Sequence, residues 1–189
     1  MASVVKICNR ALTQLGANLI TSLDDSSTEA NVMKAAFDEV RDAVLREAKP
    51  ACATFRATLV KSATGPAFGW NNSYQLPTDP YCLAVLKMNE TDDHRDWEVE
   101  GRQLVTDYSS AKIKYIGRVT DTGQIDPLTV TAIALRLAAE TCYAITQNAS
   151  KEDRMWKKAD EALTNAQIAD GHEKGSEVVI ATRFQKARQ

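Results

Sequence analysis

The sequence predicts an α+β fold that is mainly α-helical, with an antiparallel helical bundle, a small inserted antiparallel β-sheet and an extended C-terminal arm. Three observations predict this fold. Segments with helical periodicity lie on both sides of a middle segment that is rich in turn residues and short strand-like runs. The last residues form a separate strand-like segment with a basic end. We therefore expect one domain over 1–170, with the bundle formed by 1–62 and 124–170, the β-rich insertion by 63–123, and the arm by 171–189.

The N-terminal part carries the signals of two helices. Ser3 is a suitable N-cap for the first helix, and Gly16 is suited to end it. Between them, apolar residues recur with the spacing of one helical face. In SSTE, Ser26 and Glu29 have the spacing of a capping box. This spacing predicts that the second helix starts there and runs to the residues before Pro50.

The amino-acid composition changes in the middle of the chain. The segment ACATFRATLV at 51–60 is apolar enough to predict one more short helix. From residue 64 to residue 123, Gly, Pro and Asn cluster between segments of β-branched and aromatic residues. The strand-like segments are YCLAVLKM, DWEV, RQLVTD and AKIKYIGRV. In the last of these, Lys112 and Lys114 alternate with apolar residues, which is typical of a half-buried strand.

A long apolar helix is expected after the insertion. Asp126 can cap it, and the proline that follows suits the first helical turn, so the helix is predicted over 127–148. Its apolar residues lie on more than one side, which requires cover on several faces. The cover can come from the helical bundle itself or from a neighbouring subunit, and Ile133, Leu137 and Ala144 are the candidates for a contact between subunits. The same apolar stretch contains Arg136 and Glu140. Charged side chains are costly inside a membrane, so no membrane segment is expected.

The chain ends in a segment unlike the rest. A last helix is expected to start at a cap formed by Ser150 with Asp153. After it, SEVVIATRFQKARQ alternates apolar and polar residues as an extended strand does, and its end is basic. No further element remains for this strip to fold against, which favours an arm that binds another protein over a disordered terminus. The residues expected to make this contact are Val178, Ile180, Arg183, Phe184 and Lys186.

One short stretch could carry catalysis. In DWEVEGRQLVTD, Glu98 and Glu100 stand two residues apart, which on one strand gives a separation of about 6.6 Å along the chain. That distance overlaps the spacings used by glycosidases. However, Glu100-Gly101 falls where two strands would join, so Glu100 is expected in a hairpin turn. The sequence therefore favours a structural hairpin, with a peptidoglycan-cleaving glycosidase as the alternative.

Other kinds of chemistry have no signature in the sequence. The motifs for phosphate loops, dinucleotide binding, hydrolase nucleophiles and zinc proteases are absent, so we expect no enzyme and no cofactor. His94 lies among acidic neighbours but fits a solvated loop better than a metal site, so no metal is expected. The four cysteines are far apart, as reduced thiols in a protein made in a cytoplasm would be. We also expect no secretion signal, because no charged, then apolar, then small-residue leader opens the sequence.

The net charge of −2 argues against sequence-independent binding of nucleic acid, which needs a basic surplus. A DNA-packaging helper, such as a small terminase subunit, is a further alternative. It would be expected to carry a basic helical region that binds DNA, and we find no such region in the sequence. Direct recognition of DNA is therefore not expected.

Several segments in a fixed order resemble a known family. They are CNRALTQLGA, SLDDSSTEA, RDAVLREAKP, FGW, YQLPTDP, WEVEGRQLVTD, YIGRVTD and RLAAETCYAIT. In this order the chain resembles the head-to-tail connector family of short-tailed bacteriophages, which includes tail tubular protein A and portal adaptors. The resemblance covers about residues 3–170. One departure is Ala51-Cys52, where relatives often have a tryptophan.

The resemblance implies a structural protein of the virion, located at the head–tail junction and assembled in the host cytoplasm. Such proteins form a ring, typically of twelve subunits, between the portal and the tail nozzle or tube. For this chain it implies the portal as the partner of the arm, and loops around Trp70 and His94 as the tail-facing surface. Double-stranded DNA is expected to pass through the lumen without specific binding, because a net negative ring would let it slide.

Overall fold

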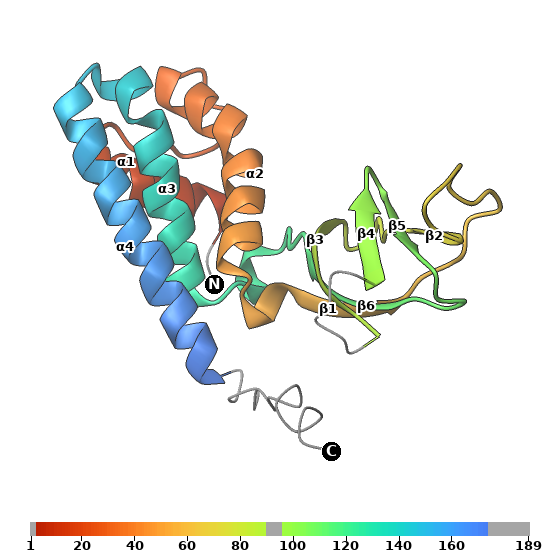
Figure 1. Ribbon diagram of the computed structural model, residues 1–189. Coiled ribbons are helices and arrows are strands. Elements are labelled where there is room, and N and C mark those ends of the chain that lie inside the picture. The colour runs from red at the N-terminus through yellow and green to blue at the C-terminus, as the bar shows by residue number, and fades with distance from the viewer. Residues whose placement is uncertain (1–2, 90–95, 174–189) are drawn as a thin grey trace.

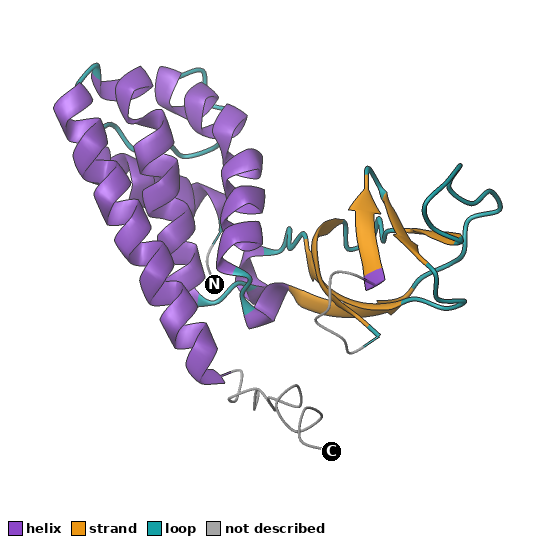
Figure 2. Cartoon of the chain, in the orientation of Figure 1, coloured by secondary structure: helices purple, strands orange, loops and turns teal. Residues whose placement is uncertain are grey.

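The computed structural model describes residues 3–89 and 96–173 of the chain. In this part, four helices lie together on one side and the β-strands lie together on the other (Figure 1). Figure 2 shows the same separation by type of secondary structure. The predicted combination of helices with antiparallel sheet is confirmed, although the strands form two small sheets rather than one.

The first two helices start and end at residues with clear capping roles. Helix α1 (Val4–Leu15) is capped by the Ser3 hydroxyl and ends at Gly16, whose φ of 63° lies in the left-handed region that glycine tolerates. Helix α2 (Thr28–Ala48) is capped by Ser27, one residue later than predicted. The Ser27 hydroxyl accepts a hydrogen bond from the third amide that follows it, as N-caps do.

The other two helices pack closely on each other. Helix α3 (Pro127–Thr146) begins as predicted, because the Asp126 carboxylate accepts hydrogen bonds from the first free amides of the helix. Helix α4 (Ala149–Glu173) starts earlier than expected, with the Asn148 side chain rather than Ser150 accepting from a backbone amide of the first turn. It also extends three residues past the predicted boundary at residue 170.

The segment 51–60 contains a strand instead of the predicted helix. After one 3-10 turn, η1 (Ala51–Ala53), the chain enters strand β1 (Thr54–Thr58). This strand pairs antiparallel with β6 (Lys112–Gly117). Its partly buried and exposed residues alternate, and threonines lie at both ends, which suits a half-buried strand better than a helix. The β-rich part therefore begins at residue 54 rather than 63.

The strands form two three-stranded antiparallel sheets. The strand order is β1-β6-β3 in the first and β2-β5-β4 in the second. The bounds of the remaining strands are β2 (Asn72–Gln75), β3 (Cys82–Met88), β4 (Trp97–Glu100) and β5 (Gln103–Thr106). Two residues, Gly101 and Arg102, connect β4 to β5. Gly101 has a φ of 57°, and a positive φ at this position is what short hairpin turns require.

Two hydrophobic cores hold these elements, and β6 contributes to both. One core lies mainly between the helices and includes Ile116 of β6. The other lies between the inner faces of the two sheets, where Ile113 and Tyr115 of β6 meet Trp97 and Leu104 of the second sheet. Because successive residues of a strand point to opposite faces, β6 can bury side chains in both cores.

A series of charged side chains joins the helices to the sheet. The Arg41 guanidinium donates to the carboxylates of Asp38 at 2.7 Å and Asp42 at 2.9 Å. Asp42 also accepts a hydrogen bond of 2.7 Å from Arg118, which follows β6. The Arg41 side chain is only 6% exposed, so these carboxylates replace the water that it loses on folding.

Candidate functional surfaces

Most residues predicted to contact the portal or the tail lie in parts that the structure does not describe. His94 belongs to the segment 90–95, and the predicted portal-binding residues belong to 174–189. The latter are Val178, Ile180, Arg183, Phe184 and Lys186. Trp70 is described and lies partly buried in the loop that precedes β2. Phe68 in the same loop is 89% exposed, so this loop presents an aromatic side chain to solvent.

The predicted subunit contact on α3 is largely wrong. Ile133 and Leu137 are completely buried in the core between the helices, so they have no surface with which to contact another subunit. Ala144 is exposed. The error arose because α3 is apolar on more than one side, and periodicity alone does not say which side faces the other helices.

The apolar side of α3 that remains at the surface is a different one. Leu128 is 43% exposed, and Leu135, about two helical turns further along the same face, is partly exposed. With Ala162 of α4 they line an open groove of about 230 Å³. We call this the α3–α4 groove. Lys158 and Glu161 also line it, so apolar and charged side chains lie side by side in the groove.

Glu98 and Glu100 share one exposed face of β4. Glu100 is the last residue of β4 and pairs with Gln103, so the prediction that it lies in the turn is wrong. The turn is one residue further on, at Gly101. Trp97 is buried between the sheets, and the two glutamates point to the opposite, outer face because side chains alternate along a strand. We call Glu98 and Glu100 the acidic face.

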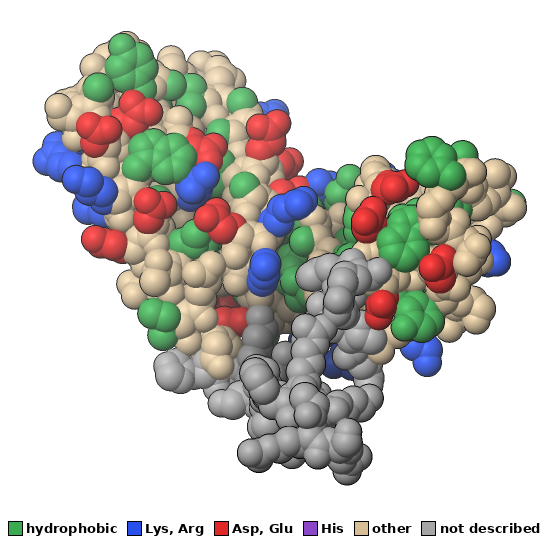
Figure 3. All heavy atoms as spheres, in the orientation of Figure 1, with side chains coloured by type: hydrophobic (Ala, Val, Ile, Leu, Met, Phe, Trp, Pro, Cys, Tyr) green, Lys and Arg blue, Asp and Glu red, His purple; other side chains and the backbone are tan. Residues whose placement is uncertain are grey.

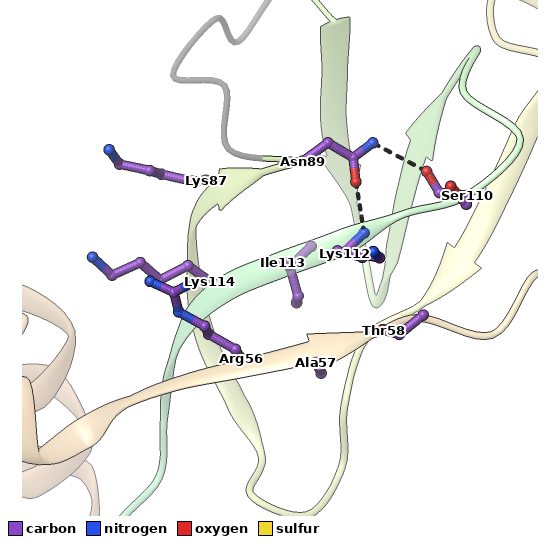
Figure 4. A pocket seen from close by; sticks show the side chains of 9 residues that line it. All are labelled: Arg56, Ala57, Thr58, Lys87, Asn89, Ser110, Lys112, Ile113 and Lys114. Atoms are coloured by element: carbon purple, nitrogen blue, oxygen red, sulfur yellow. Dashed lines mark hydrogen bonds between the residues drawn. The ribbon is translucent and has the colours of Figure 1, made fainter.

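The opposite sheet carries a group of cations around an open hollow of about 780 Å³. Arg56 comes from β1, Lys87 from β3, and Lys112 and Lys114 from β6 (Figure 4). The Arg56, Lys87 and Lys114 side chains extend from the sheet in the same general direction. No acidic residue lines the hollow in the described part of the chain. We call this the basic hollow.

Cross-strand pairing places these cations unusually close to one another. Arg56 lies directly opposite Lys114, and Lys87 lies opposite Lys114 on its other side. Neighbouring strands are about 4.8 Å apart, and like charges directly opposite each other are unfavourable. Among the described residues, Arg56, Lys112 and Lys114 form no ion pair. Such an arrangement is expected where the cost is offset by an anionic partner.

The edge of the basic hollow is fixed by hydrogen bonds. The Asn89 side chain donates to the Ser110 carbonyl at 3.1 Å and accepts from the Lys112 amide at 2.9 Å (Figure 4). These bonds join the end of β3 to the start of β6. Sequence reasoning missed the hollow because the alternation of Lys112 and Lys114 was interpreted only as a strand, and Arg56 was assigned to a helix.

The exposed charges on the helical part are distributed differently. On the face shown in Figure 3, acidic and basic side chains are interspersed over the helices, with hydrophobic side chains between them. Mixed charge of this kind is usual on a solvated protein surface. The basic hollow is therefore distinguished by having one sign of charge within a small area.

The remaining reactive groups suggest no metal or thiol site. In residues 3–89 and 96–173, no three His, Cys, Asp or Glu side chains are grouped as metal ligands. Burial raises the pKa of the Cys8 thiol to about 11, so it stays protonated at neutral pH. Helix α3 is long and apolar enough to span a membrane by length and composition. Its buried side, however, packs against the other helices as that of a core helix does.

No family model matches the chain, and no curated protein matches it.

Proposed function

We propose that this chain is a structural adaptor of a bacteriophage virion. It forms a ring between the portal and the tail nozzle or tube, around the channel through which the genome leaves the head. The observation that carries the proposal is the ordered series of segments, from CNRALTQLGA to RLAAETCYAIT, that resembles the head-to-tail connector family. The arrangement of the four helices as an antiparallel bundle, with an extended C-terminal arm, belongs to the same proposal.

The described surfaces support a protein that works through contacts. The α3–α4 groove offers exposed leucines next to charged residues, which is the composition of many protein contacts. The loop with Phe68 offers an exposed aromatic side chain, and aromatic residues are enriched where proteins meet. Contacts of this kind are what an adaptor between two other virion proteins requires.

The glycosidase alternative has less support. Glu98 and Glu100 do share a strand face, as a catalytic pair could, but both are exposed on an open strand. A general acid of this type needs a desolvated site within a cleft. The DNA-packaging alternative also lacks its expected feature, because the basic hollow lies on a sheet rather than on a helix that could enter a groove of DNA.

Removal of residues 176–189 is expected to abolish binding to the cognate portal, because this segment carries the proposed contact residues. Co-sedimentation of the truncated chain with assembled portal measures the loss. A full-length variant with Ile180→Asp and Phe184→Asp should bind as weakly, whereas Lys186→Gln should have a smaller effect, because burial of apolar side chains contributes more to binding than one ion pair usually does. Unchanged binding by the truncated chain would refute the assignment of the arm.

A further inference from the structure

The acidic face and the basic hollow lie on opposite sides of the β-rich part. Trp97 and Leu104 of the second sheet share one core with Ile113 and Tyr115 of the first, so these residues mark the two inner faces. Because side chains alternate along a strand, the glutamates of β4 and the cations of the first sheet point away from this shared core. Their outer faces therefore point away from each other, and one copy of the chain is unable to join them.

We propose that the acidic face of one copy docks into the basic hollow of the next copy. The inference rests on the proposed ring and deepens it, because it names the surfaces through which neighbouring subunits meet. Since the two surfaces differ, the contact is heterologous, and repetition of a heterologous contact produces a ring when the rotation closes.

The spacing of the charges on the two surfaces is matched. Glu98 and Glu100 are two residues apart on one strand face, and so are Lys112 and Lys114. Both pairs are therefore separated by about 6.6 Å along their strands. Two carboxylates can thus face two ammonium groups in one orientation of the strands. Arg56, opposite Lys114, adds a guanidinium that can donate two hydrogen bonds to one carboxylate.

The charged side chains proposed to meet in this contact reach solvent in the described part of the chain. Glu98, Glu100, Arg56 and Lys112 are exposed, and Lys114 is partly exposed. In the described part of the chain, neither glutamate forms an ion pair. Docking would place opposite charges next to one another and relieve the repulsion between Arg56 and Lys114.

Nucleic acid is the other polyanion that a basic surface could bind. A second copy is favoured because this chain itself contains a matching acidic surface, whereas its net charge of −2 opposes general attraction to phosphates. The two occupants are separated by the experiment below, which includes duplex DNA as a competing ligand.

A charge-swap experiment on the full-length protein tests the proposal. One variant carries Lys112→Glu and Lys114→Glu, and the other carries Glu98→Lys and Glu100→Lys. Each variant alone would bring like charges together, so its self-association at low ionic strength should be at least about tenfold weaker than that of the parent. An equimolar mixture should recover association, because each altered surface then meets its complement. Sedimentation velocity measures all three samples.

Chemical cross-linking identifies the residues that are in contact between copies. A carbodiimide joins carboxylates to amines in direct contact, and a mixture of isotopically light and heavy chains distinguishes links between copies from links within one. We expect links between copies that join Glu98 or Glu100 to Lys112 or Lys114. The proposal is overturned by a parent that does not self-associate at low salt, by links from these lysines only to acidic residues of 90–95 in the same chain, or by variants that associate as the parent does.

Binding assays with duplex DNA and ring assembly on the portal distinguish the remaining outcomes. If the parent binds duplex DNA and the lysine variant does not, while both self-associate equally, the hollow binds phosphate and the docking proposal is wrong. If the parent forms rings on the portal and the unmixed variants form the same rings, the adaptor function stands and this contact fails. If the parent forms no ring on the portal but its charge-swapped variants associate only when mixed, the contact stands and the adaptor function fails.

Discussion

Replacement of Leu137 by alanine is expected to lower the free energy of unfolding by about 3 kcal/mol. Leu137 is completely buried in the helical core, so its truncation removes apolar contacts and leaves a cavity that the neighbouring helices fill only in part. Urea unfolding, followed by circular dichroism, measures this change. The midpoint urea concentration should fall, whereas the dependence of the unfolding free energy on urea concentration should stay close to that of the parent.

The matched control is Leu128→Ala on the same helix. Leu128 is 43% exposed at the α3–α4 groove, so its truncation should cost less than about 1 kcal/mol in the isolated chain. Equal losses for the two variants would contradict the orientation of α3. The same pair of variants therefore tests whether Leu137 lies in the helical core rather than at a subunit surface.

Replacement of Asp42 by asparagine is expected to cost about 2–3 kcal/mol of stability. Asp42 lies between Arg41 and Arg118 and accepts hydrogen bonds from both guanidinium groups. Arg41 is almost fully buried, and loss of the carboxylate charge would leave it with a single acidic partner. Breaking a buried pair is costly because the remaining charge stays desolvated. Arg118 is more exposed, which places the cost at the lower end of the usual range.

Asp38→Asn is the control for this network. Its side chain is 78% exposed, and exposed ion pairs contribute little because water screens them, so the variant should lose less than about 1 kcal/mol. Thermal unfolding at two salt concentrations compares the variants. An Asp42→Asn variant as stable as Asp38→Asn would show that this network does not hold the helices to the sheet.

The parts of the fold that depend on local sequence were predicted well. Ser3, Gly16 and Asp126 act as caps in the structure as they do in the prediction, because capping involves only the residues of one helical turn. The alternation of Lys112 and Lys114 with apolar residues also placed β6 correctly, since the side-chain period of a strand is local.

The errors concern features that depend on partners distant in the sequence. The segment 51–60 became a strand because β6, more than fifty residues away, offers it a hydrogen-bonding edge and a core. The basic hollow arises only when β1 and β3 bring Arg56 and Lys87 beside Lys114. No short motif contains these residues together, and their meeting is a consequence of strand register.

The orientation of α3 shows a second kind of limit. Because α3 has apolar residues on several faces, more than one of these faces could pack against a core. The choice is made by the shapes of α1, α2 and α4, which together enclose Ile133 and Leu137 and leave Leu128 at the surface. Periodicity indicates that such a helix needs cover on several faces, but packing decides which cover each face receives.

Electron microscopy of the protein mixed with its cognate portal tests the adaptor function most directly. We expect closed rings of this chain stacked on the portal and coaxial with its channel, with density for the C-terminal segment against portal subunits. Mixtures in which portal particles remain bare, while the protein is folded and present in excess, would contradict the proposed function.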